Sequence, residues 1–143
     1  MRKTNYIIIS IVLLLILFLA IIGFKNSDYR IKNLEETLEV DPENVTRISL
    51  SHPINKGRYK STEDEGKIEF FIEFLDGVNY RRLPGDQSAY MPMSASMIYL
   101  YEGDKVDFIV PYEQEAMISY KVYEIRNGML ENTFIIEFYN SLD

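Results

Sequence analysis

An uncharged apolar run near the N-terminus constrains this chain more than any other feature of its sequence. Residues 6–24 read YIIISIVLLLILFLAIIGF, and fifteen of these nineteen positions are Ile, Leu, Val or Phe. As a helix, the run would span about 28 Å, close to the roughly 30 Å hydrocarbon core of a bilayer. It has no polar stripe that would keep one side of a helix in water. The sequence therefore predicts a single transmembrane helix over residues 6–24.

The residues around this run predict a retained anchor. A cleaved signal peptide has a shorter apolar stretch, of about 7–15 residues, followed by a small-residue cleavage site. Here Gly23 is the only small residue placed for cleavage, and Ile21 stands two positions before it. Basic residues on the two sides nearly balance, but the compact pair Arg2 and Lys3 is typical of a signal anchor. We expect a single-pass protein of the cell membrane whose C-terminal domain is extracytoplasmic.

The part of the chain after Phe24 is acidic, with 13 basic and 22 acidic residues and a net charge of −9. This balance argues against a nucleic-acid partner, because such binding requires a basic surface. The absence of cysteine excludes disulfides, thiol nucleophiles and lipid-modified cysteines. The only histidine is His52, so a two-histidine metal site is excluded as well. We expect no metal and no cofactor.

The pattern of polar and apolar residues divides the chain into a basic flank (1–5), the anchor (6–24), a linker (25–44) and one folded domain (45–143). We expect an α+β domain, with an antiparallel sheet of about five or six strands and two helices on one face. The expected strands are VTRISL (45–50), GRYKST (57–62), VNYRRL (78–83), SMIYLY (96–101), VDFIVP (106–111) and MISYKVYEI (117–125). EGDK (102–105) and RNGM (126–129) are hairpin signals.

Two helices are predicted from apolar residues spaced along one helical face. The first begins at a capping box of Thr62 and Glu65 and stops at Gly77. Its apolar face consists of Ile68, Phe71, Ile72 and Leu75. The second lies in TFIIEFYNSL (133–142), and its apolar face consists of Phe134, Ile135, Phe138 and Leu142.

No residue pattern in the sequence points to a catalytic centre. His52 has no Gly-x-Ser-x-Gly nucleophile motif to work with, and we expect it to be a polar residue at a strand end. Glu69 and Glu73 lie four residues apart on the first predicted helix. The two alternatives are that they act as an acid/base pair or that they belong to the solvated face of the helix. We expect a protein that is not an enzyme, and a small envelope hydrolase that uses paired carboxylates is the alternative.

A row of basic residues is one candidate contact surface. Lys56, Arg58 and Lys60 alternate, so a strand would project all three from one face. Arg81 and Arg82 add positive charge nearby in the sequence. These side chains are candidates for contact with an anion, such as a lipid headgroup or a wall-polymer phosphate. The alternative is that they keep an edge strand from pairing with other chains.

Tyrosine is abundant, with 11 residues, and many lie in the second half of the chain. Tyr99 and Tyr101 share one face of a predicted strand. The long loop of residues 84–96 carries Tyr90, Met91 and Met93. Aromatic and methionine side chains are typical of partner-contact surfaces, although strands also favour tyrosine for packing. We predict that these five residues contact a protein or cell-envelope partner.

The order of these features resembles small membrane-anchored or lipoprotein-type extracytoplasmic domains of Gram-positive bacteria. The resemblance rests on the basic start, the aliphatic anchor, the VTRISL strand, the threonine-capped helix and the tyrosine-rich hairpins. It implies an outward-facing domain and no active-site residue, and this chain lacks the cysteine that carries lipid in the lipoprotein members. We expect a membrane-anchored binding module. An accessory subunit of a membrane complex, bound through its helix, is a further alternative.

Overall fold

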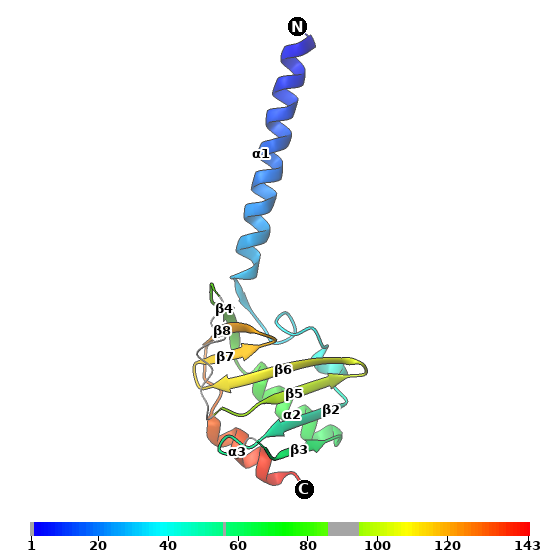
Figure 1. Cartoon of the computed structure of the whole chain (residues 1–143), viewed down its shortest axis with the longest axis vertical. Helices are drawn as coiled ribbons and strands as arrows, with labels where there is room; N and C mark the ends of the chain where they lie inside the picture. The colour runs from blue at the N-terminus through cyan, green and yellow to red at the C-terminus, as the bar shows by residue number, and fades with distance from the viewer. Residues whose placement is uncertain (1, 56, 86–94) are drawn as a thin grey trace. The chain divides into compact units, whose positions relative to one another are not determined.

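The computed structural model describes residues 2–55, 57–85 and 95–143 (Figure 1). The chain divides into two compact units, Met1–Arg30 and Ile31–Asp143. The first contains the helix α1, Arg2–Asp28, whose described apolar side chains are exposed. By length and composition, its stretch Tyr6–Asp28 is sufficient to cross a membrane. The helix agrees with the apolar run at residues 6–24 and is longer at both ends.

The described residues of the second unit form one antiparallel sheet of eight strands. The strand order is β1-β4-β8-β7-β6-β5-β2-β3. The strands are β1 (Ile31–Lys32), β2 (Arg47–Ser51), β3 (Tyr59–Thr62), β4 (Asn79–Arg82), β5 (Ile98–Glu102), β6 (Lys105–Tyr112), β7 (Glu115–Ile118) and β8 (Lys121–Arg126). The α+β class is confirmed, whereas the expected number of five or six strands was too small.

Two features account for the additional strands. The expected single strand at residues 117–125 is divided by a turn at Ser119 and Tyr120, whose φ angles are 44° and 67°. Two consecutive positive φ angles suit a tight hairpin turn, which usually contains Asn or Gly. Neither residue is a strong signal for such a turn, so the sequence pattern of residues 117–125 predicted one strand. The second feature is β1, a two-residue strand that pairs with β4 inside the expected linker.

Of the two hairpin signals, one joins paired strands and the other does not. Gly103, with φ of 56°, lies in the turn that connects β5 to β6, as expected for EGDK. Asn127 and Gly128 also have positive φ angles, but no strand follows them. Instead Leu130 makes an isolated bridge to Glu113, and a helix begins two residues later. Residues 132–141 form a helix here because a helix places the apolar side chains of this segment on one side, against the sheet. A further strand would point them to alternate sides.

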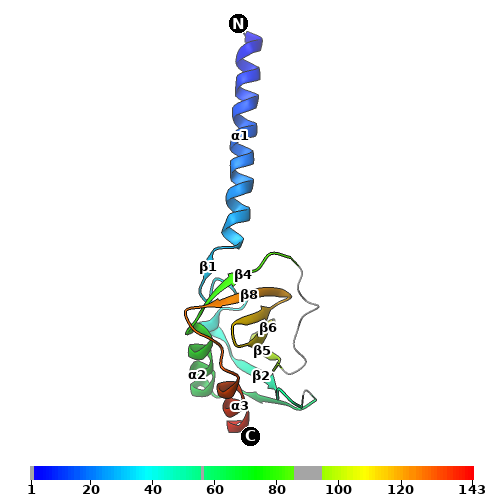
Figure 2. The same cartoon turned by 90° about the vertical axis from the view of Figure 1, so that its left-hand side faces the viewer.

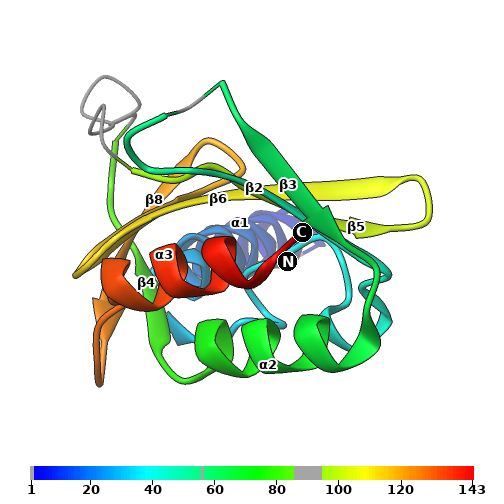
Figure 3. The same ribbon diagram turned by 90° about the horizontal axis from the view of Figure 1, so that it is seen from below.

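Two helices cover the same face of the sheet (Figure 2) (Figure 3). The helix α2, Glu65–Asp76, buries Ile68, Phe71 and Leu75 against the sheet. The helix α3, Asn132–Ser141, buries Ile135, Phe138 and Tyr139 in the same core. Both predicted helices are therefore confirmed, together with most of their expected apolar faces.

The start of α2 differs from the expected capping box. Its N-cap is Asp64, whose side chain accepts a hydrogen bond of 2.9 Å from the backbone N–H of Lys67. Thr62 instead accepts from the backbone N–H of Asp64, at 3.2 Å. An aspartate satisfies a free N–H at a helix start as well as a threonine does, and its negative charge also complements the helix dipole. The helix ends at Gly77, as expected.

The folded unit begins earlier than the expected boundary at residue 45. Leu34 and Val40 are 0% and 2% exposed and belong to the main core. Residues 31–44 of the expected linker are thus part of the domain, and they end in the short 3-10 helix η1, Pro42–Asn44. Burial of these two apolar side chains stabilises the packing of this segment on the main core.

A second, smaller apolar cluster contains Ala95, Val110, Met117 and Val122. Val110, Met117 and Val122 are opposite one another in β6, β7 and β8, so they share one face of the sheet. The residues that precede and follow Val110 in β6, Ile109 and Pro111, point the other way, and Ile109 belongs to the main core. Both faces of the sheet therefore carry buried apolar residues, and within the described part of the chain only one face is covered by helices.

Candidate functional site

The face of the sheet without helices carries a continuous group of aromatic side chains. We call it the aromatic face, made of Arg47, Tyr59, Tyr99, Tyr101, Phe108 and Tyr120. The ring of Tyr99 lies 6.0 Å from that of Tyr59 and 6.4 Å from those of Tyr101 and Phe108. Tyr120 meets the Phe108 ring edge-on at 4.8 Å. These geometries are typical of favourable aromatic pairs.

The strand register explains why these rings meet. Arg47 lies opposite Tyr101, and Tyr99 lies opposite Phe108. Residues directly opposite in an antiparallel pair point to the same face. The guanidinium carbon of Arg47 lies 4.0 Å from the centre of the Tyr101 ring, in a cation–π contact. The register therefore joins residues from β2, β3, β5 and β6 into one surface.

The aromatic face is partly open to solvent. Tyr120 is 77% exposed and Tyr59 is 46% exposed. Partial burial, together with the nearby hydroxyl groups of Tyr59, Tyr101 and Tyr120, raises the pKa of Tyr99 above its usual value. Its hydroxyl therefore stays protonated near neutral pH and can donate a hydrogen bond. Among the described residues of β2, β3, β5 and β6, none of the side chains directed to this face is acidic.

Of the five predicted partner-contact residues, two lie on this surface. Tyr99 and Tyr101 project from the same face of β5, as the alternation predicted. Tyr90, Met91 and Met93 fall outside the described residues. The sequence did not indicate that Arg47, Tyr59, Phe108 and Tyr120 would join them, because that depends on pairing between distant strands.

The predicted anion-contact residues are distributed over two distant parts of the sheet. Arg58 directly precedes β3 and Lys60 lies in it, whereas Arg81 and Arg82 lie in β4. Five strands separate β3 from β4 in the strand order. Lys56 falls outside the described residues. The structure thus does not bring the two parts of the expected basic surface together.

Lys60 has a structural role at the end of α3. Its ammonium group donates to the backbone carbonyl of Leu142 and lies 5.0 Å from the centre of the Tyr139 ring. Lys67 donates to the neighbouring carbonyl of Ser141, at 2.9 Å. Lysine side chains near a helix C-terminus satisfy free carbonyl groups and complement the helix dipole. These contacts account for the positions of both ammonium groups without an external anion.

His52 stabilises a turn at the end of β2. Its Nδ1 atom accepts hydrogen bonds from the backbone N–H groups of Ile54 and Asn55, at 3.1 and 3.3 Å. The imidazole ring also contacts the Tyr139 ring edge-on, at 5.1 Å. These contacts agree with a polar residue at a strand end.

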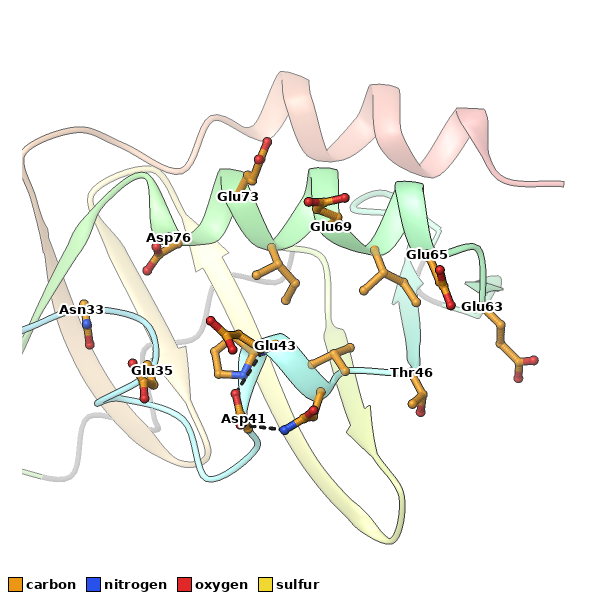
Figure 4. Close-up of a pocket in the computed structure, with 15 residues that line it drawn as sticks. Asn33, Glu35, Asp41, Glu43, Thr46, Glu63, Glu65, Glu69, Glu73 and Asp76 are labelled. Carbon is orange, nitrogen blue, oxygen red and sulfur yellow. Dashed lines mark hydrogen bonds between the residues drawn. The ribbon is translucent and has the colours of Figure 1, made fainter.

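A groove lies on the other side of the sheet, between α2 and residues 33–46 (Figure 4). We call it the acidic groove. It has a volume of about 900 Å³, and Val45, Ile68 and Ile72 provide apolar lining. Eight carboxylates also line it: Glu35, Asp41, Glu43, Glu63, Glu65, Glu69, Glu73 and Asp76. No Lys, Arg or His is among its lining residues in the described part of the chain. Glu69 and Glu73, expected as either an acid/base pair or a solvated face, both belong to this lining.

One wall of the acidic groove is held by side chains from β5 and β6. Asp107, which is 1% exposed, accepts hydrogen bonds from the backbone N–H groups of Glu39 and Val40 at 2.6 and 2.9 Å. Glu102 accepts from the backbone N–H of Asp41 at 3.0 Å. The Asp41 side chain in turn caps η1 by accepting a hydrogen bond of 3.0 Å from the backbone N–H of Glu43. These contacts hold the wall in place without a bound ligand.

The pKa of Glu102 is lowered, first by the Asp41 N–H and then by Lys105, whose ammonium lies 3.1 Å away. A carboxyl with a lowered folded-state pKa contributes stability above its unfolded pKa, and the contribution is lost as the pH falls. We expect Glu102→Gln to make the free energy of unfolding less sensitive to acid below about pH 4.5, the usual value for glutamate. Urea unfolding of the full chain in detergent micelles at several pH values measures this change. Parallel pH profiles for the variant and the native protein would contradict it.

The carboxylates of the acidic groove are spread out. Among the described residues, no group of three or more His, Cys, Asp or Glu side chains is placed to hold a metal ion. The groove therefore presents a line of separate negative charges over apolar lining, which differs from a compact chelating site.

Fold and sites together describe an α+β domain in a chain whose N-terminal helix is of transmembrane length and composition. The domain has an aromatic face on one side of its sheet and an acidic groove on the other. Comparison of the chain with protein-family models, with curated proteins and with solved structures finds no match.

Proposed function

We propose that this chain is a membrane-anchored, non-enzymatic binding module whose aromatic face contacts a protein partner outside the cytoplasm. One observation carries the proposal: a solvent-accessible aromatic surface to which the described residues of β2, β3, β5 and β6 direct no acidic side chain, in a domain of net charge −9. The anchor is the apolar stretch of α1, and the pair Arg2 and Lys3 favours an extracytoplasmic domain.

The composition of the aromatic face supports a protein partner. Tyrosine and arginine are enriched at the centres of protein interfaces, where they contribute much of the binding energy. The Arg47 side chain is already held over Tyr101, and Tyr59 already contacts Tyr99. Side chains ordered before binding lose less conformational entropy on association. The surface is thus suited to bind without extensive rearrangement.

The proposal is tested by photo-crosslinking in living cells. A photoreactive phenylalanine analogue replaces Tyr59 or Tyr120, the two most exposed rings of the aromatic face. We expect both positions to give the same crosslinked protein, because their rings belong to one surface. Tyr99→Ser together with Tyr101→Ser is expected to remove these crosslinks. Protease treatment of cells without their wall is expected to digest residues 31–143 while the anchor fragment stays in the membrane.

The matched control is Phe70, which is 55% exposed on α2, on the helix-covered side of the sheet. The analogue at Phe70 is expected to give no such crosslink. Equal crosslinking at Phe70 and at the aromatic face would overturn the proposal, as would adducts to a glycan instead of a protein. A domain that resists protease until the membrane is broken would overturn its extracytoplasmic location.

A further inference from the structure

We infer that the acidic groove binds an extended, basic segment of a partner protein, with Lys or Arg at alternate positions. This inference concerns a different surface from the aromatic face and does not depend on the proposed function. It rests on the shape of the groove, on the spacing of its charges and on its apolar lining.

The groove has the size and rigidity of a binding site. Its volume of about 900 Å³ lies at the upper end of the range for ligand pockets, roughly 300–1,000 Å³. Its wall is held by Asp107 and Glu102 through three hydrogen bonds to the backbone of residues 39–41. A site that is ordered before binding avoids the entropic cost of forming it.

The charges of α2 match the spacing of an extended chain. Glu65, Glu69 and Glu73 recur every four residues, so each lies about 6 Å further along the helix axis and about 40° further around it. They form a row that crosses α2 at a shallow angle. In an extended chain, side chains on one side recur every roughly 6.6 Å. A segment lying along this row would therefore place a cation near each of these carboxylates when its basic residues alternate. Figure 4 shows that the opposite wall adds Asp41 and Glu43.

The apolar lining favours a polypeptide over a small hydrophilic cation. Pro42 and Ile72 expose apolar surface in this lining, whereas Ile68 and Val45 are almost fully buried beneath it. Lys and Arg have long apolar stems that cover such surface while their charged ends reach carboxylates. No Lys, Arg or His lines the described part of the groove, so the partner must supply the positive charge.

Binding of synthetic peptides to the full chain in phosphatidylcholine nanodiscs tests the inference. The probe is a fluorescent peptide of about seven residues, enough in extended form to span α2, in which Lys alternates with Val and Thr. A comparison peptide has the same composition with its lysines adjacent. Fluorescence anisotropy is expected to show tighter binding of the alternating peptide, and this binding should weaken as the salt concentration rises.

The variant Glu69→Gln/Glu73→Gln is expected to weaken binding of the alternating peptide by at least about fivefold. The matched control, Asp104→Asn/Glu131→Gln, removes two exposed carboxylates outside the groove lining and should have less than about a twofold effect. Equal losses in the two variants would show attraction to net charge alone and overturn the inference. Equal affinity for the two peptides would overturn the inference. Displacement of the alternating peptide by spermine, with an affinity equal to that of the peptide itself, would also overturn it.

Discussion

Replacing Phe71 with alanine is expected to lower the free energy of unfolding by about 3–5 kcal/mol, which approaches the whole stability of a small domain. Phe71 is fully buried in α2, and its ring lies 4.4 Å from that of Phe138 in α3. It also lies 5.9 Å from the Phe74 ring and 6.1 Å from the Phe134 ring. The substitution would open a cavity between the two helices. Urea unfolding of the full chain in detergent micelles, followed by near-ultraviolet circular dichroism of tyrosine, measures the loss.

The neighbouring residue Phe70 provides the control. It is 55% exposed, although its ring lies 5.2 Å from that of Phe134. Because truncation there opens no buried cavity, Phe70→Ala should cost no more than about 1 kcal/mol. Similar losses for the two variants would contradict the assignment of Phe71 to the core and would indicate a general loss of helix stability.

The features that sequence analysis predicted correctly are those with local causes. The apolar faces of α2 and α3 follow from the spacing of residues within each helix, and Gly77 marks the end of α2 on its own. The turn at Gly103 has the same local character. Helix periodicity and turn chemistry act over a few residues, so they can be read without knowing what the segment packs against.

The missed features of the fold depend on contacts between distant residues. The two-residue strand β1 exists because it pairs with β4, about fifty residues later in the chain. Leu34 and Val40 are buried in the main core, whereas the sequence pattern placed them in a linker. The turn at Ser119 and Tyr120 adopts positive φ angles that these residue types do not favour by themselves.

In the aromatic face and the acidic groove, too, the local features were predictable and those that depend on distant contacts were not. Alternation placed Tyr99 and Tyr101 on one strand face, but only the pairing of β2, β3 and β6 adds Arg47, Tyr59 and Phe108 to them. Glu69 and Glu73 could be placed on one side of α2 from their spacing. The opposite wall of the acidic groove could not be predicted, because it is held by hydrogen bonds between residues about 67 positions apart.

The second large effect is expected at Asp107, whose carboxylate holds that wall. Its Oδ2 atom accepts from the backbone N–H groups of Glu39 and Val40, and its Oδ1 atom accepts from the hydroxyl of Ser119. Asp107→Ala leaves three donors without this acceptor in a part of the protein where Asp107 itself is 1% exposed. The Val40 N–H is buried and the other two donors are partly buried. Since an unsatisfied buried donor costs about 1–3 kcal/mol, we expect a loss of about 2–4 kcal/mol in the free energy of unfolding.

Asp107→Asn separates hydrogen bonding from charge. Its amide oxygen can still accept from the Glu39 and Val40 N–H groups, and its amide nitrogen can donate to the Ser119 hydroxyl oxygen. We therefore expect asparagine to cost only about 1–2 kcal/mol, because bonds to a charged acceptor are stronger than neutral ones. Hydrogen exchange should show faster opening of residues 39–41 in the alanine variant than in the asparagine variant. Equal destabilisation by the two substitutions would contradict the role of these bonds, whereas the expected order would show that one buried carboxylate determines both the stability of the domain and the shape of the acidic groove.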